Sequence, residues 1–153
     1  MPKTILTYGT FDLFHIGHLR LLERLRSMGD RLVVGVSTDE FNAGKGKKTV
    51  APFAERLEII QSLRCVDLAI AETCWEQKAS DIANHQVAIL GMGDDWHGKF
   101  DELSSLCEVV YLPRTEGISS TEIRNSLKVL APEHISELKQ ALDVMSSIVA
   151  RFD

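Results

Sequence analysis

Five short runs of apolar, mostly β-branched residues alternate along this chain with segments that have the periodicity of amphipathic helices. The runs cover residues 4–8, 32–37, 67–71, 87–92 and 109–112. Apolar residues at consecutive positions are typical of strands buried on both faces of a parallel sheet. Strand and helix in alternation require right-handed crossovers between parallel strands. The sequence therefore predicts an α/β fold with a doubly wound, Rossmann-like five-stranded parallel sheet and helices on both faces.

The segments between the runs have helical signals. Leucines recur at three-residue steps from position 19, and a Gly-Asp pair at 29–30 ends that pattern. Residues 52–63 begin with a proline and have one apolar stripe, residues 75–84 have a weaker helical pattern, and residues 119–127 open on a Ser/Thr cluster that suits an N-cap. Ligands in such folds bind beyond the carboxyl ends of the strands, so the segments after each strand are the place to look for function.

The end of the chain predicts one more helix. Pro132 and Glu133 suit a helix start. Six apolar residues then recur at spacings of three and four, which places them on one face: Ile135, Leu138, Leu142, Met145, Val149 and Phe152. We expect residues 1–130 to form one domain and residues 131–153 a C-terminal amphipathic helix that extends the same domain. Its apolar face packs either on its own subunit or against a partner chain.

Composition excludes several classes of function. The 153 residues suit one compact domain, and a net charge of −5 argues against a nucleic-acid-binding surface. The sequence contains no run of about 18 apolar residues, so it does not predict membrane insertion. The apolar part of the N-terminal segment is too short for a secretory signal, and we therefore expect a cytoplasmic protein. Cys65, Cys74 and Cys107 lack metal-ligand spacing and are expected to be small buried hydrophobes.

The segment after the first predicted strand has the strongest functional signal. It reads YGTFDLFHIGH over residues 8–18, with Gly9 at the strand end. Gly9 permits a close backbone approach to a ligand. His15 and His18 flank Gly17 where a helix begins, so two imidazoles and the free N–H groups of the helix can face one anion. Two unrelated histidines, one capping and one packed, are the simpler alternative, but the strand-end glycine before them favours a functional pair.

A lysine cluster follows the second strand. Lys45, Lys47 and Lys48 surround Gly46, and such point charges on a mobile stretch can follow phosphate oxygens. Arg56, at the start of the next helix, could join them. The alternative is a solvated charge cluster with an ordinary surface arginine.

Two further segments follow the fourth and fifth strands. Residues 91–96 (GMGDDW) combine glycines that admit a flat base with a carboxylate that can accept from an exocyclic amine, although a Gly-Asp turn explains them equally well. Residues 114–121 (RTEGISST) combine an arginine fork for phosphate oxygens with hydroxyls at a helix N-terminus. A plain N-cap would explain one hydroxyl but would leave the others and Arg114 without a role.

Together these motifs resemble the cytidylyltransferases of the HxGH nucleotidyltransferase superfamily, and among them those that act on glycerol 3-phosphate. The resemblance rests on HIGH at 15–18 and RTEGISST at 114–121, and it extends through STDEFN at 37–42, WEQK at 75–78, GMGDDW at 91–96 and EVVYLP at 108–113. It covers roughly residues 4–128, with motif order and spacing in agreement. The glycines flanking Lys45 depart from the usual pattern, and the resemblance does not extend to the tail.

The resemblance implies a role for each matching residue. His15 and His18 would stabilise the transferring α-phosphate and the departing pyrophosphate. Lys45 and Lys47 would neutralise phosphates of both substrates, while Arg56, Trp75 and Lys78 would shape the acceptor-phosphate side. The residues implied in nucleotide binding are Gly9, Thr10, Phe11, Asp95, Arg114, Ile118, Ser119, Ser120 and Thr121. The implied catalytic residues are His15, His18, Lys47 and Arg114.

The implied reaction transfers CMP from CTP to glycerol 3-phosphate and gives CDP-glycerol and pyrophosphate, as in cell wall or capsule polysaccharide biosynthesis. Mg²⁺ would accompany CTP, with no dedicated metal cage in the protein and Asp12 as the one candidate ligand. A homodimer is expected from the resemblance. The alternatives are a cytidylyltransferase for another phosphorylated alcohol or amino alcohol, an adenylyltransferase using ATP, and a non-catalytic nucleotide sensor, which would have no need of transition-state donors.

Overall fold

The structure is a computed structural model that describes residues 1–117, 119–127 and 132–152. It divides into two compact units, Met1–Ile118 and Ser119–Asp153. The first unit contains the sheet and four of the described helices. The second contains two helices.

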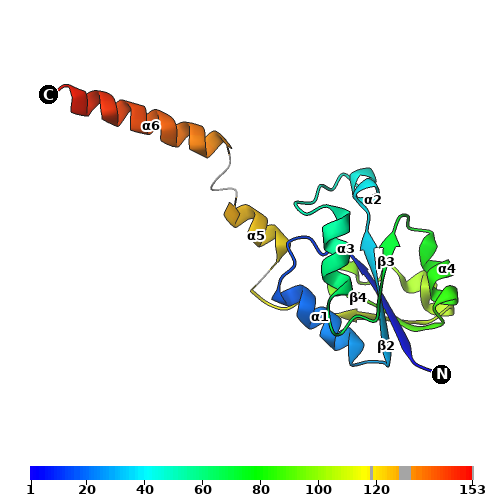
Figure 1. The fold of residues 1–153 in the computed structure, drawn as a ribbon. Coiled ribbons are helices and arrows are strands. Elements are labelled where there is room, and N and C mark those ends of the chain that lie inside the picture. Colours follow the sequence, from blue (N-terminus) through cyan, green and yellow to red (C-terminus); the bar gives the residue numbers. More distant parts are fainter. Residues whose placement is uncertain (118, 128–131, 153) are drawn as a thin grey trace. The chain divides into compact units, whose positions relative to one another are not determined.

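The first unit is built on a five-stranded parallel sheet (Figure 1). Its strands are β1 (Thr4–Gly9), β2 (Arg31–Ser37), β3 (Leu68–Glu72), β4 (Val87–Gly93) and β5 (Glu108–Leu112). The spatial order is β3-β2-β1-β4-β5, so the chain builds outward from β1 and then returns to add β4 on its other side. In open parallel sheets, ligands bind at the carboxyl ends of the strands beside such a reversal, which here are β1 and β4. The predicted α/β fold is confirmed, with each strand within one residue of its predicted ends.

Four of the described helices and two short 3₁₀ segments belong to this unit, and two further described helices belong to the second. The helices of the first unit are α1 (Ile16–Arg26), α2 (Asp39–Gly44), α3 (Phe53–Gln61) and α4 (Gln77–Asn84), and the 3₁₀ segments are η1 (Asp94–Trp96) and η2 (Asp101–Ser105). The second unit contains α5 (Ser120–Leu127) and α6 (Pro132–Ala150). The sequence pattern did not reveal α2, because it is six residues long and ends in the glycine-rich lysine segment.

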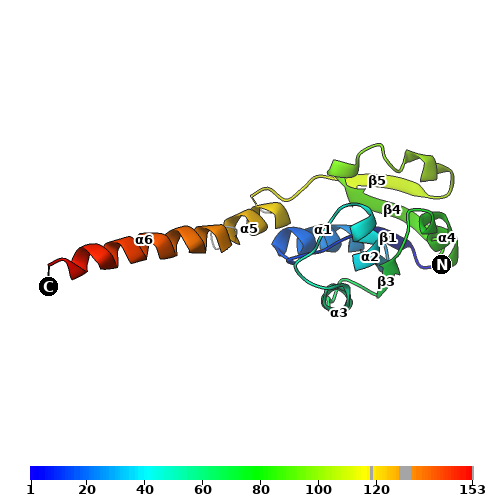
Figure 2. The same ribbon diagram turned by 90° about the horizontal axis from the view of Figure 1, so that it is seen from above.

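Each face of the sheet has its own hydrophobic core. On one face, Leu22 and Leu25 of α1 and Ile60 of α3 pack against Ile5 and Val34 of the strands. On the other face, Ile82 of α4 and Phe100, which precedes η2, pack against Leu6, Val33 and Leu90. Figure 2 shows the sheet between these layers. The strands are apolar at consecutive positions because their side chains point alternately into the two cores.

The predicted C-terminal helix is present as α6, which spans 19 residues. The apolar residues at positions 135, 138, 142, 145 and 149 lie within it, on one face by their spacing. None of the described helices is both long enough and apolar enough to cross a membrane.

Candidate active site

The loop between β1 and α1 has an unusual backbone conformation. Gly9 ends β1, and a Cβ at this position would lie 2.8 Å from the ring of Phe11. Phe11 and Leu13 adopt left-handed backbone angles, with φ of 54° and 49°. Such angles are costly for residues with a side chain and cluster at functional sites. Buried Phe11 supports the loop by placing its ring edge-on to His18, with centroids 5.5 Å apart.

His15 and His18 begin α1 as a reciprocal cap. The N–H of Gly17 donates to His15 Nδ1 at 3.0 Å, and the N–H of His15 donates to His18 Nδ1 at 3.3 Å. Each Nδ1 is therefore an acceptor, which leaves the Nε2 of each neutral ring to carry the proton. The local fold thus gives both imidazoles an outward N–H donor, which is the group that a phosphate oxygen needs.

Both histidines favour the neutral state. Burial, followed by the adjacent charge of His15, lowers the pKa of His18 to about 4. Burial and the positive charge of Arg114 lower the pKa of His15 below its ordinary value. The pair can therefore serve near neutral pH as hydrogen-bond donors whose charge does not depend on small pH changes.

Arg114 approaches His15 from the segment after β5. A side chain that sequence reasoning did not single out holds this segment: Arg24 Nη1, near the end of α1, donates to the carbonyl of Pro113 at 2.9 Å. Arg24 therefore ties the segment that carries Arg114 to the helix that carries the histidines. The sequence offered no signal for this contact, because Arg24 reads as a surface residue of α1.

The lysine segment lies beside the same loop. Lys47 Nζ donates to Thr10 Oγ1 at 3.0 Å, and the hydroxyl of Ser37 at the end of β2 donates to the same oxygen at 3.3 Å. Lys47 also contributes to the electrostatic environment that lowers the pKa of His18. Gly46 has a φ of 69°, which a glycine adopts without strain, and this turn brings Lys47 back toward Thr10.

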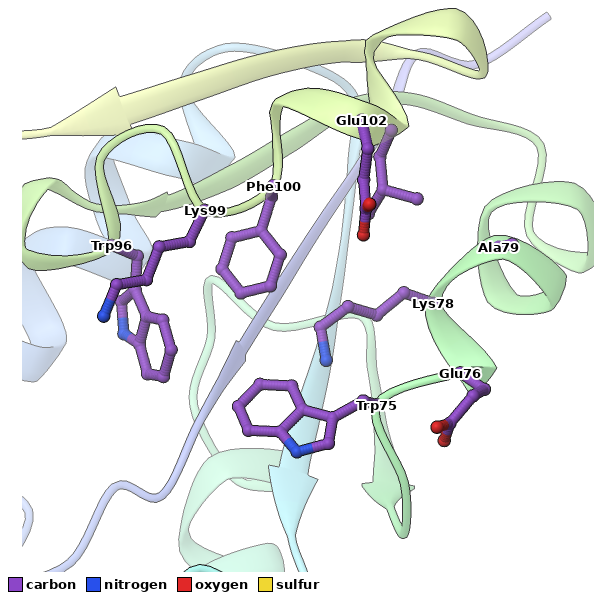
Figure 3. Close-up of a pocket in the computed structure, with 9 residues that line it drawn as sticks. Trp75, Glu76, Lys78, Ala79, Trp96, Lys99, Phe100 and Glu102 are labelled. Carbon is purple, nitrogen blue, oxygen red and sulfur yellow. The ribbon is translucent and has the colours of Figure 1, made fainter.

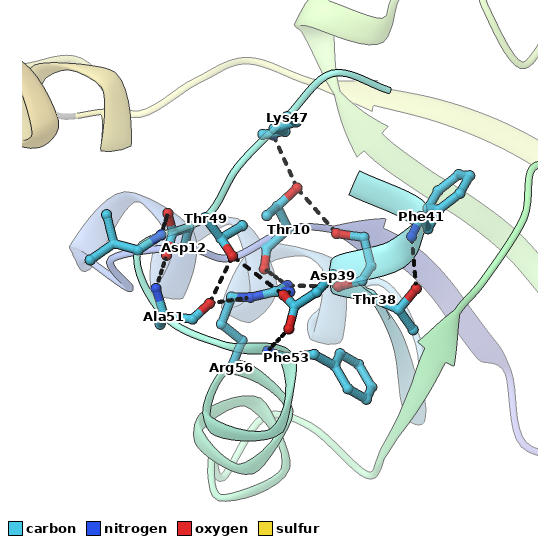
Figure 4. Close-up of polar contacts among 12 residues, drawn as sticks. Thr10, Asp12, Thr38, Asp39, Phe41, Lys47, Thr49, Ala51, Phe53 and Arg56 are labelled. Atoms are coloured by element: carbon cyan, nitrogen blue, oxygen red, sulfur yellow. Dashed lines mark hydrogen bonds and ion pairs between the residues drawn. The ribbon is translucent and has the colours of Figure 1, made fainter. Parts of the chain in front are cut away.

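Arg56 has a different setting from the one that the resemblance implies. Its guanidinium is buried and makes four hydrogen bonds within the protein (Figure 4). It donates to the carbonyls of Thr10, Ser37 and Ala51 and to Asp39 Oδ1, at 2.7 to 3.0 Å. These bonds use four of the five N–H donors that a guanidinium carries. Arg56 therefore joins the ends of β1 and β2 to the chain that follows the lysines.

Two aspartates complete this network. Asp12 accepts from the N–H groups of Val50 and Ala51 at 2.9 and 3.0 Å, and Asp39 accepts from the N–H of Phe53 at 3.0 Å (Figure 4). The backbone bond from Phe53 and the charge-assisted bond from Arg56 hold the pKa of Asp39 below its ordinary value. Both carboxylates thus fasten the segment that follows the lysines.

A pocket of about 460 Å³ opens next to the lysines. Aromatic and charged side chains line it (Figure 3): Trp75, Glu76, Lys78, Ala79, Trp96, Lys99, Phe100, Glu102 and Leu103. Trp75 stands edge-on to Trp96 at 5.9 Å between ring centroids, and Lys45 Nζ lies 5.2 Å from the Trp75 ring. The resemblance placed Trp75 and Lys78 together, and the structure brings them to one pocket. Trp96 and Phe100 are wall residues that the sequence reading did not assign to the acceptor.

A row of cations connects this pocket to the histidines. The pKa of Lys45 is lowered mainly by burial, with Lys47 and Lys78 as neighbouring positive charges. Lys47 in turn neighbours His18. The residues predicted from three separate motifs therefore form one continuous electropositive edge at the carboxyl ends of the strands.

Asp95 lies in η1, directly after β4. Its Oδ1 packs over Gly93, where a Cβ would come within 2.6 Å of it, so a side chain at position 93 would require the carboxylate to shift. The side chain is exposed. An exposed acceptor at this edge fits the predicted contact with a base.

The remaining predicted nucleotide residues occupy positions 118–121, where the first unit ends in the sequence and the second begins. Ile118 lies outside the described residues. Ser119 caps α5, where its Oγ accepts from the N–H of Glu122 at 3.1 Å. Ser120 and Thr121 form the first turn of α5. These residues belong to the second unit, so their approach to the triphosphate stays a prediction.

The described residues do not form a metal cage. Among residues 1–117, 119–127 and 132–152, no group of three His, Cys, Asp or Glu side chains is arranged to hold an ion. Both oxygens of Asp12, the candidate ligand, accept backbone hydrogen bonds.

Comparison with known proteins agrees with this geometry. The profile of the cytidylyltransferase-like family matches residues 6–126. A glycerol-3-phosphate cytidylyltransferase of Bacillus subtilis is 54% identical over 125 residues, which are 82% of this chain and 97% of the relative. A glycerol-3-phosphate cytidylyltransferase of Staphylococcus aureus is 50% identical over 82% of this chain and 95% of its own.

A solved structure shares the fold. The lipopolysaccharide core biosynthesis protein of Thermoplasma volcanium superposes with a TM-score of 0.68, at 24% identity, over 76% of this chain and all of its own. At this identity the likeness concerns the fold alone.

Proposed function

The chain belongs to the cytidylyltransferase-like family, and we propose on that premise that it is a glycerol-3-phosphate cytidylyltransferase. It transfers CMP from CTP to glycerol 3-phosphate and gives CDP-glycerol and pyrophosphate. The observation that carries this assignment is the match to a glycerol-3-phosphate cytidylyltransferase at 54% identity over 97% of that relative's length. The nucleotidyltransferase machinery of the relative therefore has a counterpart in this chain.

The reaction is a substitution at phosphorus. A phosphate oxygen of glycerol 3-phosphate attacks the α-phosphorus of CTP, the new phosphorus–oxygen bond forms, and the bond from the α-phosphorus to the bridging oxygen of the β-phosphate breaks. That oxygen leaves with pyrophosphate. The attacking phosphate is already anionic near neutral pH, so no strong general base is needed. Positioning and charge stabilisation supply the catalysis.

The histidines act on the transferring group. Their Nε2–H donors lie at the start of α1, where the helix dipole and the unpaired N–H groups already favour an anion. The stacked rings place two donors together, so both can bond oxygens that gain charge in the transition state. The lowered pKa values keep both imidazoles neutral near pH 7. A neutral imidazole still has the one N–H that this role requires.

The cation row binds the phosphates of both substrates. Lys47 donates to Thr10 in the loop that leads to His18, Lys78 lines the pocket beside Trp75, and Lys45 Nζ lies 5.2 Å from the same ring. We assign the pocket to the acceptor, with Lys78 and Lys45 toward its phosphate. Arg114, next to His15, is assigned to the triphosphate. Arg56 contributes by holding the lysine segment in place.

The nucleotide contacts follow the same edge. Gly9, Thr10 and Phe11 present backbone groups at the end of β1, and Asp95 lies at the end of β4 near the cytosine. The resemblance extends the triphosphate contacts to Ile118, Ser119, Ser120 and Thr121, and we keep that assignment. Mg²⁺ bound to CTP would neutralise phosphate charge.

We further propose that the enzyme is a homodimer to which α6 contributes. The family model matches residues 6–126, and matches of 125 residues cover 97% and 95% of the two relatives, so α6 lies beyond the part of the chain that the family model covers. Its apolar residues recur at heptad-like spacings, which suit packing against a second helix. A second copy of α6 would satisfy this pattern.

The acceptor is tested with a panel at fixed CTP. Pyrophosphate release is measured with glycerol 3-phosphate, phosphocholine, phosphoethanolamine and other polyol phosphates. We expect glycerol 3-phosphate to give the highest kcat/KM. A higher kcat/KM with an amino-alcohol phosphate would show that the enzyme acts on a different acceptor from the one proposed. Binding of CTP without turnover of any acceptor would favour a non-catalytic nucleotide sensor.

A further inference from the structure

A buried carboxylate lies behind the wall of the acceptor pocket. Glu72 is the last residue of β3, and it is 4% exposed. Its Oε2 accepts a hydrogen bond from Lys78 Nζ at 2.6 Å, and Lys78 is 3% exposed. Lys78 belongs to the WEQK motif at 75–78, whereas Glu72 follows an apolar run and belongs to no motif, so the sequence does not point to it.

The ammonium of Lys78 is enclosed by aromatic rings. Its Nζ lies 4.4 Å from the ring centroid of Tyr8, 4.8 Å from that of Trp75 and 5.5 Å from that of Phe100. Figure 3 shows the side chain running from α4 between Phe100 and Trp75. Ring faces attract a cation but do not fix its position along the pocket. A lysine has a flexible four-carbon stem, so a directional partner is needed to hold the ammonium at one point.

Glu72 is well placed to be that partner. Its backbone is held against the end of β2: it pairs with Ser37 in the ladder of β2 and β3, and its carbonyl accepts from the N–H of Thr38 at 3.0 Å. The other nearby acid is engaged elsewhere, since Asp81 accepts from the hydroxyl of Tyr8 at 2.7 Å and from Gln77 Nε2 at 2.8 Å. A rigid strand end therefore presents one carboxylate to one ammonium.

The remaining charges around the pair lie at the pocket surface. Lys45 is close enough for Glu72 to raise its pKa and for Lys78 to lower it. Glu76, Lys99 and Glu102 line the pocket. An ammonium has three N–H donors, and the bond to Glu72 uses one. Donors therefore remain for an oxygen in the pocket while Glu72 fixes the nitrogen from behind.

We propose that Glu72 is a positioning residue for the acceptor, which acts by holding the Lys78 ammonium in the aromatic wall so that its other N–H groups meet the acceptor phosphate. This inference rests on the proposed function, because it assigns the pocket to glycerol 3-phosphate. Glu72 itself does not line the pocket, so its effect on the acceptor passes through Lys78.

A double-mutant cycle tests this coupling. Glu72→Gln removes the charge with little change of shape, Lys78→Gln removes the ammonium, and the third variant carries both changes. We expect each single substitution to raise the KM for glycerol 3-phosphate by about tenfold, in the range found for contacting charged pairs, and to leave the KM for CTP within about twofold. The double variant is expected to be no worse than Lys78→Gln alone. Multiplied effects in the double variant would overturn the inference.

A control and a second variant keep the result clear. Glu23→Gln breaks the exposed ion pair with Arg20 on α1 and is expected to leave both KM values unchanged. If Glu72→Gln does not fold, Glu72→Asp keeps the charge at shorter reach and should still raise the KM for glycerol 3-phosphate alone. If the KM of Glu72→Asp for glycerol 3-phosphate were unchanged, or if its KM values for glycerol 3-phosphate and CTP changed equally, the inference would be overturned. Absence of turnover in the unsubstituted protein would instead overturn the proposed function and, with it, the acceptor pocket.

Discussion

The imidazole rings of His15 and His18 stack with their centroids 3.8 Å apart and their planes 21° from parallel. Each ring uses Nδ1 to accept a backbone N–H, so the two Nε2 donors are set by the helix cap. Two stacked imidazolium rings would repel, and the lowered pKa values of both histidines agree with a neutral pair. The two side chains that cap α1 are therefore also the two proposed donors to the transferring phosphate.

Replacing His18 with alanine should reduce kcat far more than it weakens CTP binding. A donor that acts mainly on the transition state contributes about 10²–10³ in kcat. His85→Ala is the matched control, since this histidine lies at the C-terminal end of α4, away from the loop of the HIGH motif. Steady-state kinetics and CTP titration on folded protein provide the comparison. A loss of less than about threefold in kcat for His18→Ala would remove it from this role.

The lowered pKa of His18 predicts a loss of stability in mild acid. Between an ordinary value near 6.5 and the folded value of about 4, the unfolded chain binds a proton at this position and the folded chain does not. The free energy of unfolding should therefore fall as the pH drops through this window, by about 1–2 kcal/mol from pH 7 to pH 5. Denaturant unfolding of the wild-type protein and of His18→Gln measures the contribution. An equal pH dependence in both would contradict it.

Arg56→Lys should destabilise the fold more than it changes the acceptor site. The substitution removes several bonds to the carbonyls of Thr10, Ser37 and Ala51, and we expect a loss of about 2–4 kcal/mol in the free energy of unfolding. Arg20→Lys, at an exposed position on α1, is the control. If stability stayed constant while the KM for glycerol 3-phosphate rose, Arg56 would bind the acceptor directly, as the resemblance implies.

Deleting residues 131–153 should weaken self-association and leave the catalytic motifs intact. The deletion removes the heptad-like face of α6, which we assign to a subunit contact. Sedimentation of the full-length and truncated proteins over a range of concentrations gives the two dimer dissociation constants. Equal constants would assign α6 to the surface of its own subunit.

The strands and most of the helices could be predicted from the sequence because local patterns determine them. A strand buried on both faces has to be apolar at consecutive positions, so its ends were found to within one residue. The short helix α2 was missed, since six residues ending in glycine have too few turns for a periodic pattern. The strand order could not be read from local pattern either, because it depends on the side of β1 to which β4 returns.

The motif residues of the site were visible, but their supports were not. Histidines, lysines and Arg114 stand in segments of unusual composition after strand ends. Glu72, Arg24 and Asp12 act through contacts with residues from 6 to 89 positions away, which a local pattern does not encode. Arg56 illustrates the converse case: its position beside the lysines suggested a phosphate contact, whereas burial turned its donors toward backbone carbonyls.

The most direct test of the account is product analysis by ³¹P NMR with glycerol 3-phosphate and, in separate reactions, CTP, ATP, GTP or UTP. With CTP we expect CDP-glycerol and pyrophosphate to form in equal amounts, at a rate well above that with the other three nucleotides, and we expect His18→Ala to suppress both products together. Equal use of ATP, or pyrophosphate release without a CDP-glycerol signal, would contradict the assignment.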